Sequence, residues 1–134
     1  DTTANAGFTI GTPWIAVNPN FKTVNVEVEE NDSNSCLNYF KKMILLRKHN
    51  KTLIYGKYTL LDKLNKQVYA YSRTLNGHIL LVLLNFSPNE AETVVPFSVN
   101  HAVTLIDNYN TTLEPKSNST IHLRPYEAVI LELK

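Results

Sequence analysis

The sequence predicts a mainly β protein, in which a long loop and one amphipathic helix precede an antiparallel β-sandwich over residues 51–134. Asn76-Gly77 separates two strand-like segments and is the strongest short hairpin signal, because both central residues of a type I′ turn need positive φ. Residues 79–84 are apolar at every position, which is typical of a central strand covered on both faces. Further short strand-like runs separated by turn residues favour a sandwich.

The expected strands begin directly after the helix. Residues 53–61 are strand-like with a kink possible at Gly56, and residues 67–75 and 78–86 flank the hairpin turn. Shorter strands are expected at residues 93–97, 102–106, 119–123 and 128–133. Four tyrosines are spaced as strand residues, so packing within the sheet is their expected role: Tyr55, Tyr58, Tyr69 and Tyr71.

Residues 32–50 are predicted to form the amphipathic helix, with Asp32 or Ser33 as its N-cap. Acidic residues lie before its start and basic residues toward its end, as the helix macrodipole favours. Its apolar residues recur at spacings of three and four and give one stripe: Cys36, Leu37, Phe40, Met43 and Ile44.

Residues 1–31 show no sustained periodicity and are punctuated by Gly7, Gly11, Pro13 and Pro19. Loops of this length are uncommon and are usually functional. A single helix before a sandwich also has no neighbouring helix against which its apolar stripe could pack. With no Met at position 1, these features predict that the chain begins inside a longer protein.

Size and composition exclude several classes of function. A chain of 134 residues is too short for a (β/α)₈ barrel, which needs about 250 residues. The formal net charge of +1 argues against nucleic acid and anionic membranes as partners. No apolar run is long enough to span a bilayer. Because Cys36 is the single cysteine, no disulfide can form within the chain.

The residues suggest no catalytic or metal centre. The histidines at positions 49, 78, 101 and 122 lack ligand spacing, and Cys36 is interpreted as a small core residue, so no metal and no cofactor are expected. Glycoside hydrolysis needs a carboxylate pair about 5 Å apart. Glu27, Glu29 and Glu30 are close in sequence, but a polar stretch before a helix offers nothing to separate their pKa values, so helix-end electrostatics explains them better.

Five Asn-x-Ser/Thr triplets are possible glycan acceptors, and chance occurrence is the favoured explanation. They begin at Asn31, Asn50, Asn85, Asn110 and Asn118. Asn85 follows the continuous apolar strand, which is a poor place for a glycan.

Three motifs in succession carry a family resemblance. The first is residues 5–9, 11–15 and 17–21 (Asn-Ala-Gly-Phe-Thr, Gly-Thr-Pro-Trp-Ile and Val-Asn-Pro-Asn-Phe). The second is residues 37–48 followed by 54–58, and the third is residues 123–128 (Leu-Arg-Pro-Tyr-Glu-Ala). Their order and spacing resemble the end of bacterial oligo-1,6-glucosidases and related α-glucosidases of the α-amylase superfamily, over essentially the whole chain.

The resemblance implies a domain division. Residues 1–50 would be the end of a catalytic (β/α)₈ barrel, namely the loop after strand 8 and helix 8, and residues 51–134 a C-terminal β-sandwich. The helix stripe would then face the barrel. The implied parent is a retaining α-glucosidase that hydrolyses terminal α-1,6 or α-1,4 bonds of short oligosaccharides and needs no cofactor.

The resemblance also limits the site residues. The family's catalytic carboxylates lie on barrel strands 4, 5 and 7, which would precede this chain, so no catalytic residue is assigned. The loop after strand 8 opens on the active-site face. Asp1, Phe8 and Trp14 are therefore expected to shape the substrate entrance, while the sandwich stabilises the barrel.

Two alternatives remain from different classes of protein. One is a non-catalytic ectodomain of the same fold, as in amino-acid transporter heavy chains, and the other is a free-standing sugar-binding module. The expected partners are the rest of the parent enzyme and a small oligosaccharide, with no nucleic acid and no membrane. The bacterial resemblance and the lack of disulfides favour a cytoplasmic location, with secretion as the alternative.

Overall fold

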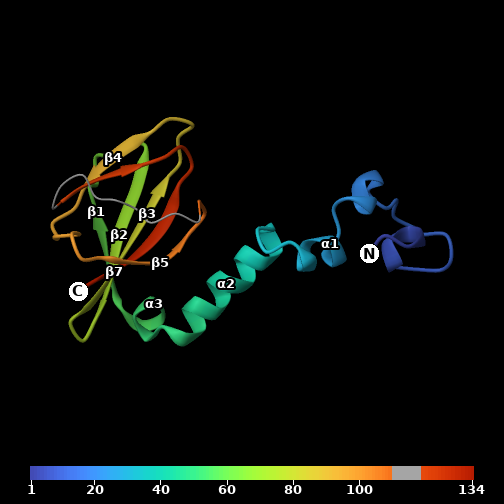
Figure 1. Cartoon of the computed structure of the whole chain (residues 1–134), viewed down its shortest axis with the longest axis horizontal. Helices are drawn as coiled ribbons and strands as arrows, with labels where there is room; N and C mark the ends of the chain where they lie inside the picture. The colour runs from blue at the N-terminus through green and yellow to red at the C-terminus, as the bar shows by residue number, and fades with distance from the viewer. Residues whose placement is uncertain (110–118) are drawn as a thin grey trace. The chain divides into compact units, whose positions relative to one another are not determined.

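Seven strands in the described residues form two antiparallel sheets, which confirms the predicted sandwich (Figure 1). The computed structural model describes residues 1–109 and 119–134. One sheet has the order β1-β2-β3-β7-β5, and β4 and β6 form the second. The strands are β1 (Lys57–Leu61), β2 (Val68–Leu75), β3 (His78–Asn85), β4 (Ala91–Val94), β5 (Val103–Asp107), β6 (Thr120–Leu123) and β7 (Ala128–Leu133).

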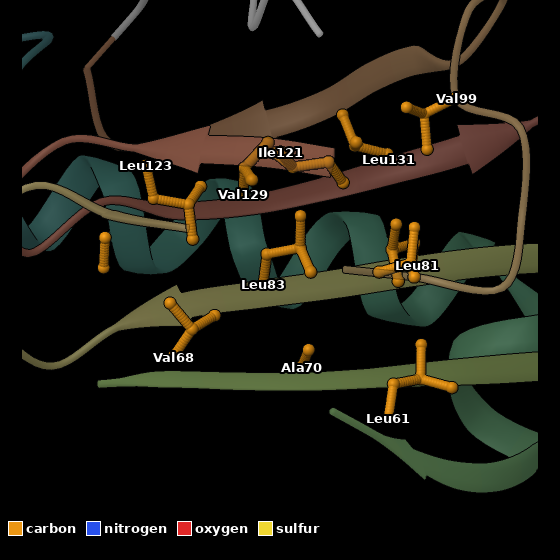
Figure 2. Packing of buried hydrophobic residues seen from close by; sticks show 12 residues of the cluster. Leu61, Val68, Ala70, Leu81, Leu83, Val99, Ile121, Leu123, Val129 and Leu131 are labelled. Carbon is orange, nitrogen blue, oxygen red and sulfur yellow. The ribbon is translucent and has the colours of Figure 1, made fainter. Parts of the chain in front are cut away.

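The hydrophobic core lies between the two sheets. Leu83 and Val129 from the larger sheet and Ile121 from the smaller one are fully buried in the same cluster. Figure 2 shows side chains from these strands converging on one interior. The alternation of side chains along each strand explains why every second residue of β2 contributes: Val68, Ala70 and Ser72 are buried.

The hairpin prediction is confirmed at the turn itself. Asn76 has a φ of 50° and Gly77 a φ of 83°, so both central residues are left-handed as a type I′ turn requires. Leu75 pairs with His78 directly beside the turn, and the ladder continues to Val68 and Asn85. The turn therefore fixes the register of the two longest strands.

Residues 53–61 do not form one strand as predicted. The segment begins with helix α3 (Lys51–Tyr55), and only Lys57–Leu61 is extended as β1. Asn50 explains the helix, because its side-chain oxygen accepts from Thr52 N at 3.0 Å and from Leu53 N at 3.2 Å. Gly56 ends it, and a Cβ there would lie 2.4 Å from the Thr52 carbonyl oxygen. Local capping overrides β propensity.

The contact pattern divides the chain into two compact units, residues Asp1–Leu45 and Leu46–Lys134. The first unit contains short elements where the sequence predicted an unbroken loop. These are the 3₁₀ turns η1 (Ala4–Gly7) and η2 (Pro19–Lys22) and the helix α1 (Val26–Asn31). Asn25 caps α1 by accepting from Val28 N at 2.9 Å. Six residues are too few for a periodic pattern to reveal such a helix.

The predicted amphipathic helix is α2 (Cys36–His49), which starts later than expected. Ser35 rather than Asp32 or Ser33 caps it, through its hydroxyl oxygen and Asn38 N at 3.2 Å. The Glu29 carboxylate accepts from Leu37 N at 3.0 Å in the same first turn. No residue of α2 is buried, so the interpretation of Cys36 as a core residue is wrong for this chain.

The third sequence motif forms a closed polar clamp between β6 and β7. Glu127 is 2% exposed, and its carboxylate accepts from Arg124 N at 2.7 Å and from the guanidinium Nε at 3.1 Å. The guanidinium lies 3.9 Å over the Tyr109 ring, and the Tyr109 hydroxyl donates to Pro125 O at 2.7 Å. Hydrogen bonding to Glu127 raises the pKa of Arg124, so the guanidinium stays charged.

The possible glycan acceptors differ in accessibility. Asn85 is buried, and its amide donates to Asn89 O and Arg124 O, both at 2.8 Å, so no room remains for a glycan. Asn50 is engaged as the α3 cap, and Asn31 is exposed. Asn110 and Asn118 lie outside the described residues.

A pH-dependent contribution to stability is expected from Asp62, at the start of the β1–β2 connection. Its carboxylate accepts from Asn65 Nδ2 at 2.8 Å and from the buried Thr93 hydroxyl at 2.9 Å. These hydrogen bonds, that from Asn65 first, hold the pKa of Asp62 below its ordinary value. Asp62 therefore stabilises the fold above its unfolded pKa, about 4, and loses that contribution as pH falls through its folded pKa.

Urea unfolding of the chain and of Asp62→Asn at several pH values checks this prediction. The difference in unfolding free energy between them should be largest at neutral pH and shrink in acid. Glu90→Gln, which removes an exposed carboxylate, serves as the comparison. A difference for Asp62→Asn that stays constant from neutral pH into acid would contradict the assignment.

Candidate substrate-entrance site

The first motif folds as a left-handed turn around an acidic side chain. Asn5 and Ala6 both have a φ of 55° and Gly7 a φ of 76°. The Asn5 amide donates to Thr9 O at 3.0 Å and to Gly11 O at 2.9 Å, which ties the turn to the loop that follows. A Cβ on Gly7 would lie 2.5 Å from the Asp1 carboxylate, so the glycine lets the backbone close over Asp1.

Asparagines hold the second half of the segment. The Asn18 side chain accepts from Asn20 N at 3.3 Å and begins η2 with Pro19. The Asn25 amide donates to Phe21 O at 2.7 Å while its oxygen caps α1. These short-range hydrogen bonds give residues 1–31 a defined path although they contain no long element.

The folded segment of residues 1–26 surrounds a partly open hollow of about 650 Å³ within the first unit. This volume falls in the range of small-molecule sites. Its wall is mainly apolar, with a few polar side chains. The lining residues are Asp1, Ala6, Phe8, Thr9, Thr12, Pro13, Trp14, Ile15, Ala16, Val17, Asn18, Asn20, Phe21, Val24, Asn25 and Val26.

The three residues predicted for the substrate entrance all line this one hollow. Phe8 is 84% exposed and Trp14 94% exposed, so both rings are available to a ligand. The Asp1 carboxylate accepts from Thr3 N at 2.9 Å and from the Thr3 hydroxyl, which orients it. Aromatic faces beside a carboxylate can stack on a sugar ring and accept from its hydroxyls.

The hollow also contains polar residues that sequence reasoning did not single out. Thr12, Asn18 and Asn20 lie in the wall of the same hollow. Their positions in the motif segments 11–15 and 17–21 were the available signal, but a motif does not give the direction of a side chain.

The neighbouring acidic residues do not form a catalytic pair. Glu29 caps α2 through its carboxylate, and Glu30 forms an exposed ion pair with Lys41 at 2.9 Å. The Glu29 contact serves a helix N-terminus and Glu27 lies in the first turn of α1, as the sequence predicted, whereas the Glu30 pair joins α1 to the middle of α2.

Residues 1–109 and 119–134 contain neither a metal-binding cluster nor a membrane-spanning helix. No group of three or more His, Cys, Asp or Glu side chains there is arranged to hold a metal ion. No helix in the same ranges has the length and apolar character needed to cross a membrane.

The protein-family model of the α-amylase catalytic domain matches residues 1–56 of the sequence. The family model of the maltogenic-amylase C-terminal domain matches residues 58–130. The second match covers more than half of the chain. The two models follow one another almost without a gap, at the point where α3 gives way to β1.

Curated relatives resemble the chain along nearly its whole length. The oligo-1,6-glucosidase of Bacillus cereus is 42% identical over 132 residues, which is 97% of this chain and 23% of that protein. The oligo-1,6-glucosidase of Parageobacillus thermoglucosidasius is 40% identical and covers 100% of this chain. The trehalose-6-phosphate hydrolase of Bacillus subtilis is 36% identical. The chain thus spans about a quarter of the length of these relatives.

Solved structures of other proteins share the fold of this chain. An isomaltulose synthase from Erwinia rhapontici superposes with a TM-score of 0.86 at 38% identity, covering 100% of this chain and 24% of the other. The isomaltulose synthase from a Klebsiella species gives a TM-score of 0.85 at 37% identity, with the same coverage.

Proposed function

This chain belongs to the family of maltogenic-amylase C-terminal domains, and from that premise we propose that it is the C-terminal part of a retaining α-glucosidase. The parent enzyme hydrolyses terminal α-1,6 or α-1,4 glucosidic bonds of short oligosaccharides, in a cytoplasmic location. Its catalytic barrel is the partner of this segment, and residues 1–50 complete that barrel while residues 51–134 form the sandwich.

The observation that carries the proposal is the order of the two family matches together with the identity to oligo-1,6-glucosidases. A transporter heavy chain or a free sugar-binding module is not favoured by relatives of this kind. Retaining hydrolysis uses one carboxylate as nucleophile and a second as acid and then base, with water releasing the sugar. We assign neither carboxylate to this chain.

Substrate turnover by the complete polypeptide tests the proposal. Release of glucose from isomaltose or maltose, with retention of the anomeric configuration, is the expected result. Because an isomaltulose synthase shares this fold, sucrose is included, and formation of isomaltulose without net hydrolysis would contradict the α-glucosidase assignment. Residues 1–134 alone should not hydrolyse p-nitrophenyl α-glucoside, and activity of that fragment would contradict the non-catalytic role.

Trp14 is expected to contribute to substrate binding in the complete enzyme. Trp14→Ala should lower kcat/KM for isomaltose roughly tenfold, or about 1.4 kcal/mol, mostly through a higher KM, because it removes the exposed ring beside the hollow. Trp14→Phe keeps a ring and should lose less.

Ile10→Ala is the matched control for this prediction. Ile10 is as exposed as Trp14 but is not among the residues that line the hollow. Equal losses of kcat/KM for Trp14→Ala and Ile10→Ala would show that the hollow does not contact substrate.

A further inference from the structure

Asn76, in the turn between β2 and β3, has a side chain with no hydrogen-bond partner among residues 1–109 and 119–134. Asn65 shows the contrast, because its amide donates to the Asp62 carboxylate at 2.8 Å and to Glu92 O at 2.7 Å. The Asn65 oxygen also accepts from Gln67 N at 3.0 Å. Such contacts hold a side-chain amide in place, whereas the Asn76 amide is free to turn toward its own backbone.

The backbone nitrogen that follows Asn76 is equally accessible. Asn76, Gly77 and His78 are all exposed, and a Cβ on Gly77 would meet no atom within 4 Å. Leu75 and His78 form the last pair of the ladder, so the Gly77 N–H lies beyond it. That N–H has no acceptor in the part of the chain that the structure describes. Glycine also allows the backbone motion that a reaction at this nitrogen requires, and exposed loop tips open most readily.

We propose that Asn76 is a site of spontaneous chemical modification, at which the side-chain amide is lost through a cyclic succinimide. Hydroxide removes the Gly77 N–H proton, and the nitrogen attacks Asn76 Cγ. The bond from Gly77 N to Cγ forms, the bond from Cγ to Nδ2 breaks, and Nδ2 takes up a proton and leaves as ammonia. Water then opens the ring. Its addition at Cγ gives aspartate, and its addition at the Asn76 main-chain carbonyl carbon gives isoaspartate.

The two products differ in what they do to the hairpin. Asp-Gly suits a type I′ turn as well as Asn-Gly does, so the aspartate form keeps the turn. Isoaspartate places its Cβ in the main chain and lengthens a two-residue connection by one methylene. The pairing of Leu75 with His78 depends on the length of that connection, and with it the register of β2 and β3. The isoaspartate form therefore loosens the hairpin, and the aspartate form does not.

Incubation of the complete polypeptide in mildly alkaline buffer, followed by peptide mapping with mass spectrometry, tests the modification. Asn76 should convert to aspartate and isoaspartate. Lys66→Gly supplies a matched Asn-Gly at Asn65, whose side chain is engaged, and Asn65 should convert several-fold more slowly than Asn76. Equal conversion at the two positions would overturn the proposal, because sequence alone would then decide reactivity. An unchanged Asn76, under conditions that modify the same polypeptide in urea, would also overturn it.

Amide hydrogen exchange of residues 68–85 tests the structural consequence. The isolated isoaspartate form should exchange several-fold faster than unmodified protein, whereas Asn76→Asp, which has the charge without the methylene, should not. Asn76→Gly keeps a favoured turn sequence and cannot lose ammonia there, so its exchange should not change on incubation. Exchange in Asn76→Asp as fast as in the isoaspartate form would contradict the backbone argument. An equal change in incubated Asn76→Gly would show that Asn76 is not the cause.

Discussion

Leu83→Ala is expected to destabilise the chain by about 2–5 kcal/mol, the range for removing a leucine from a close-packed core. Leu83 is fully buried in β3, which is paired on both sides, with β2 and with β7. Its side chain joins the cluster that includes Val129 of the same sheet and Ile121 of the other (Figure 2). A cavity there removes contacts from both layers, and backbone pairing on each side limits collapse of the strand around it.

Urea unfolding followed by circular dichroism measures this effect. Leu64→Ala is the matched control, because Leu64 is an exposed leucine in the β1–β2 connection and its truncation should change stability by less than about 0.5 kcal/mol. An equal, small effect of the two substitutions would mean that the two sheets are not packed as described.

The core was predictable because strand patterning and turn chemistry are local. The Asn76-Gly77 pair specified the hairpin and its register, and the run from residue 79 to 84 specified the central strand before any fold was known. The run also predicted cover on both faces, which Leu80, Val82 and the core residues Leu81 and Leu83 have, whereas Ile79 and Leu84 at its ends are half-buried.

Helix boundaries were less predictable because side-chain caps decided them. Residues 53–55 have strand-like composition, yet the hydrogen bonds from Thr52 N and Leu53 N to Asn50 make them helical. The start of α2 was misplaced because Asp32 is a good capping residue in sequence, whereas its oxygen accepts from Asn34 N in the turn before the helix. A choice between neighbouring caps depends on the path of the preceding chain.

The candidate site was also predictable only in part. Asp1, Phe8 and Trp14 were selected through the resemblance, and the three share the wall of one hollow. Composition could not bring them together, because the path depends on the left-handed residues 5–7 and on the Asn5 amide. The tyrosines at positions 58, 69 and 71 were interpreted as strand packing, and their rings do contact one another on β1 and β2. Tyr58 and Tyr69 are nevertheless exposed, and only Tyr71 is half-buried. Tyr55 is exposed and lies on α3 rather than on a strand.

Glu127→Ala is expected to cost about 3 kcal/mol, near the lower end of the range for breaking a buried charge pair. The carboxylate is the common acceptor for Arg124 N, Nε and Nη2, so its removal leaves three donors without their partner. The loss stays near the lower end because the Arg124 side chain is 35% exposed and can reach water. The Tyr109 hydroxyl still donates to Pro125 O and holds part of the loop.

Glu127→Gln separates charge from shape in this clamp. Glutamine fills nearly the same volume but places an amide donor against the donors of Arg124, so it should recover only part of the stability lost in Glu127→Ala. Urea unfolding of both variants, with Glu90→Gln at an exposed position as control, makes the comparison. If Glu127→Gln were as stable as the unmodified chain, the clamp would act through packing alone. The Arg-Pro-Tyr-Glu sequence would then specify the shape of the β6–β7 turn rather than an ion pair.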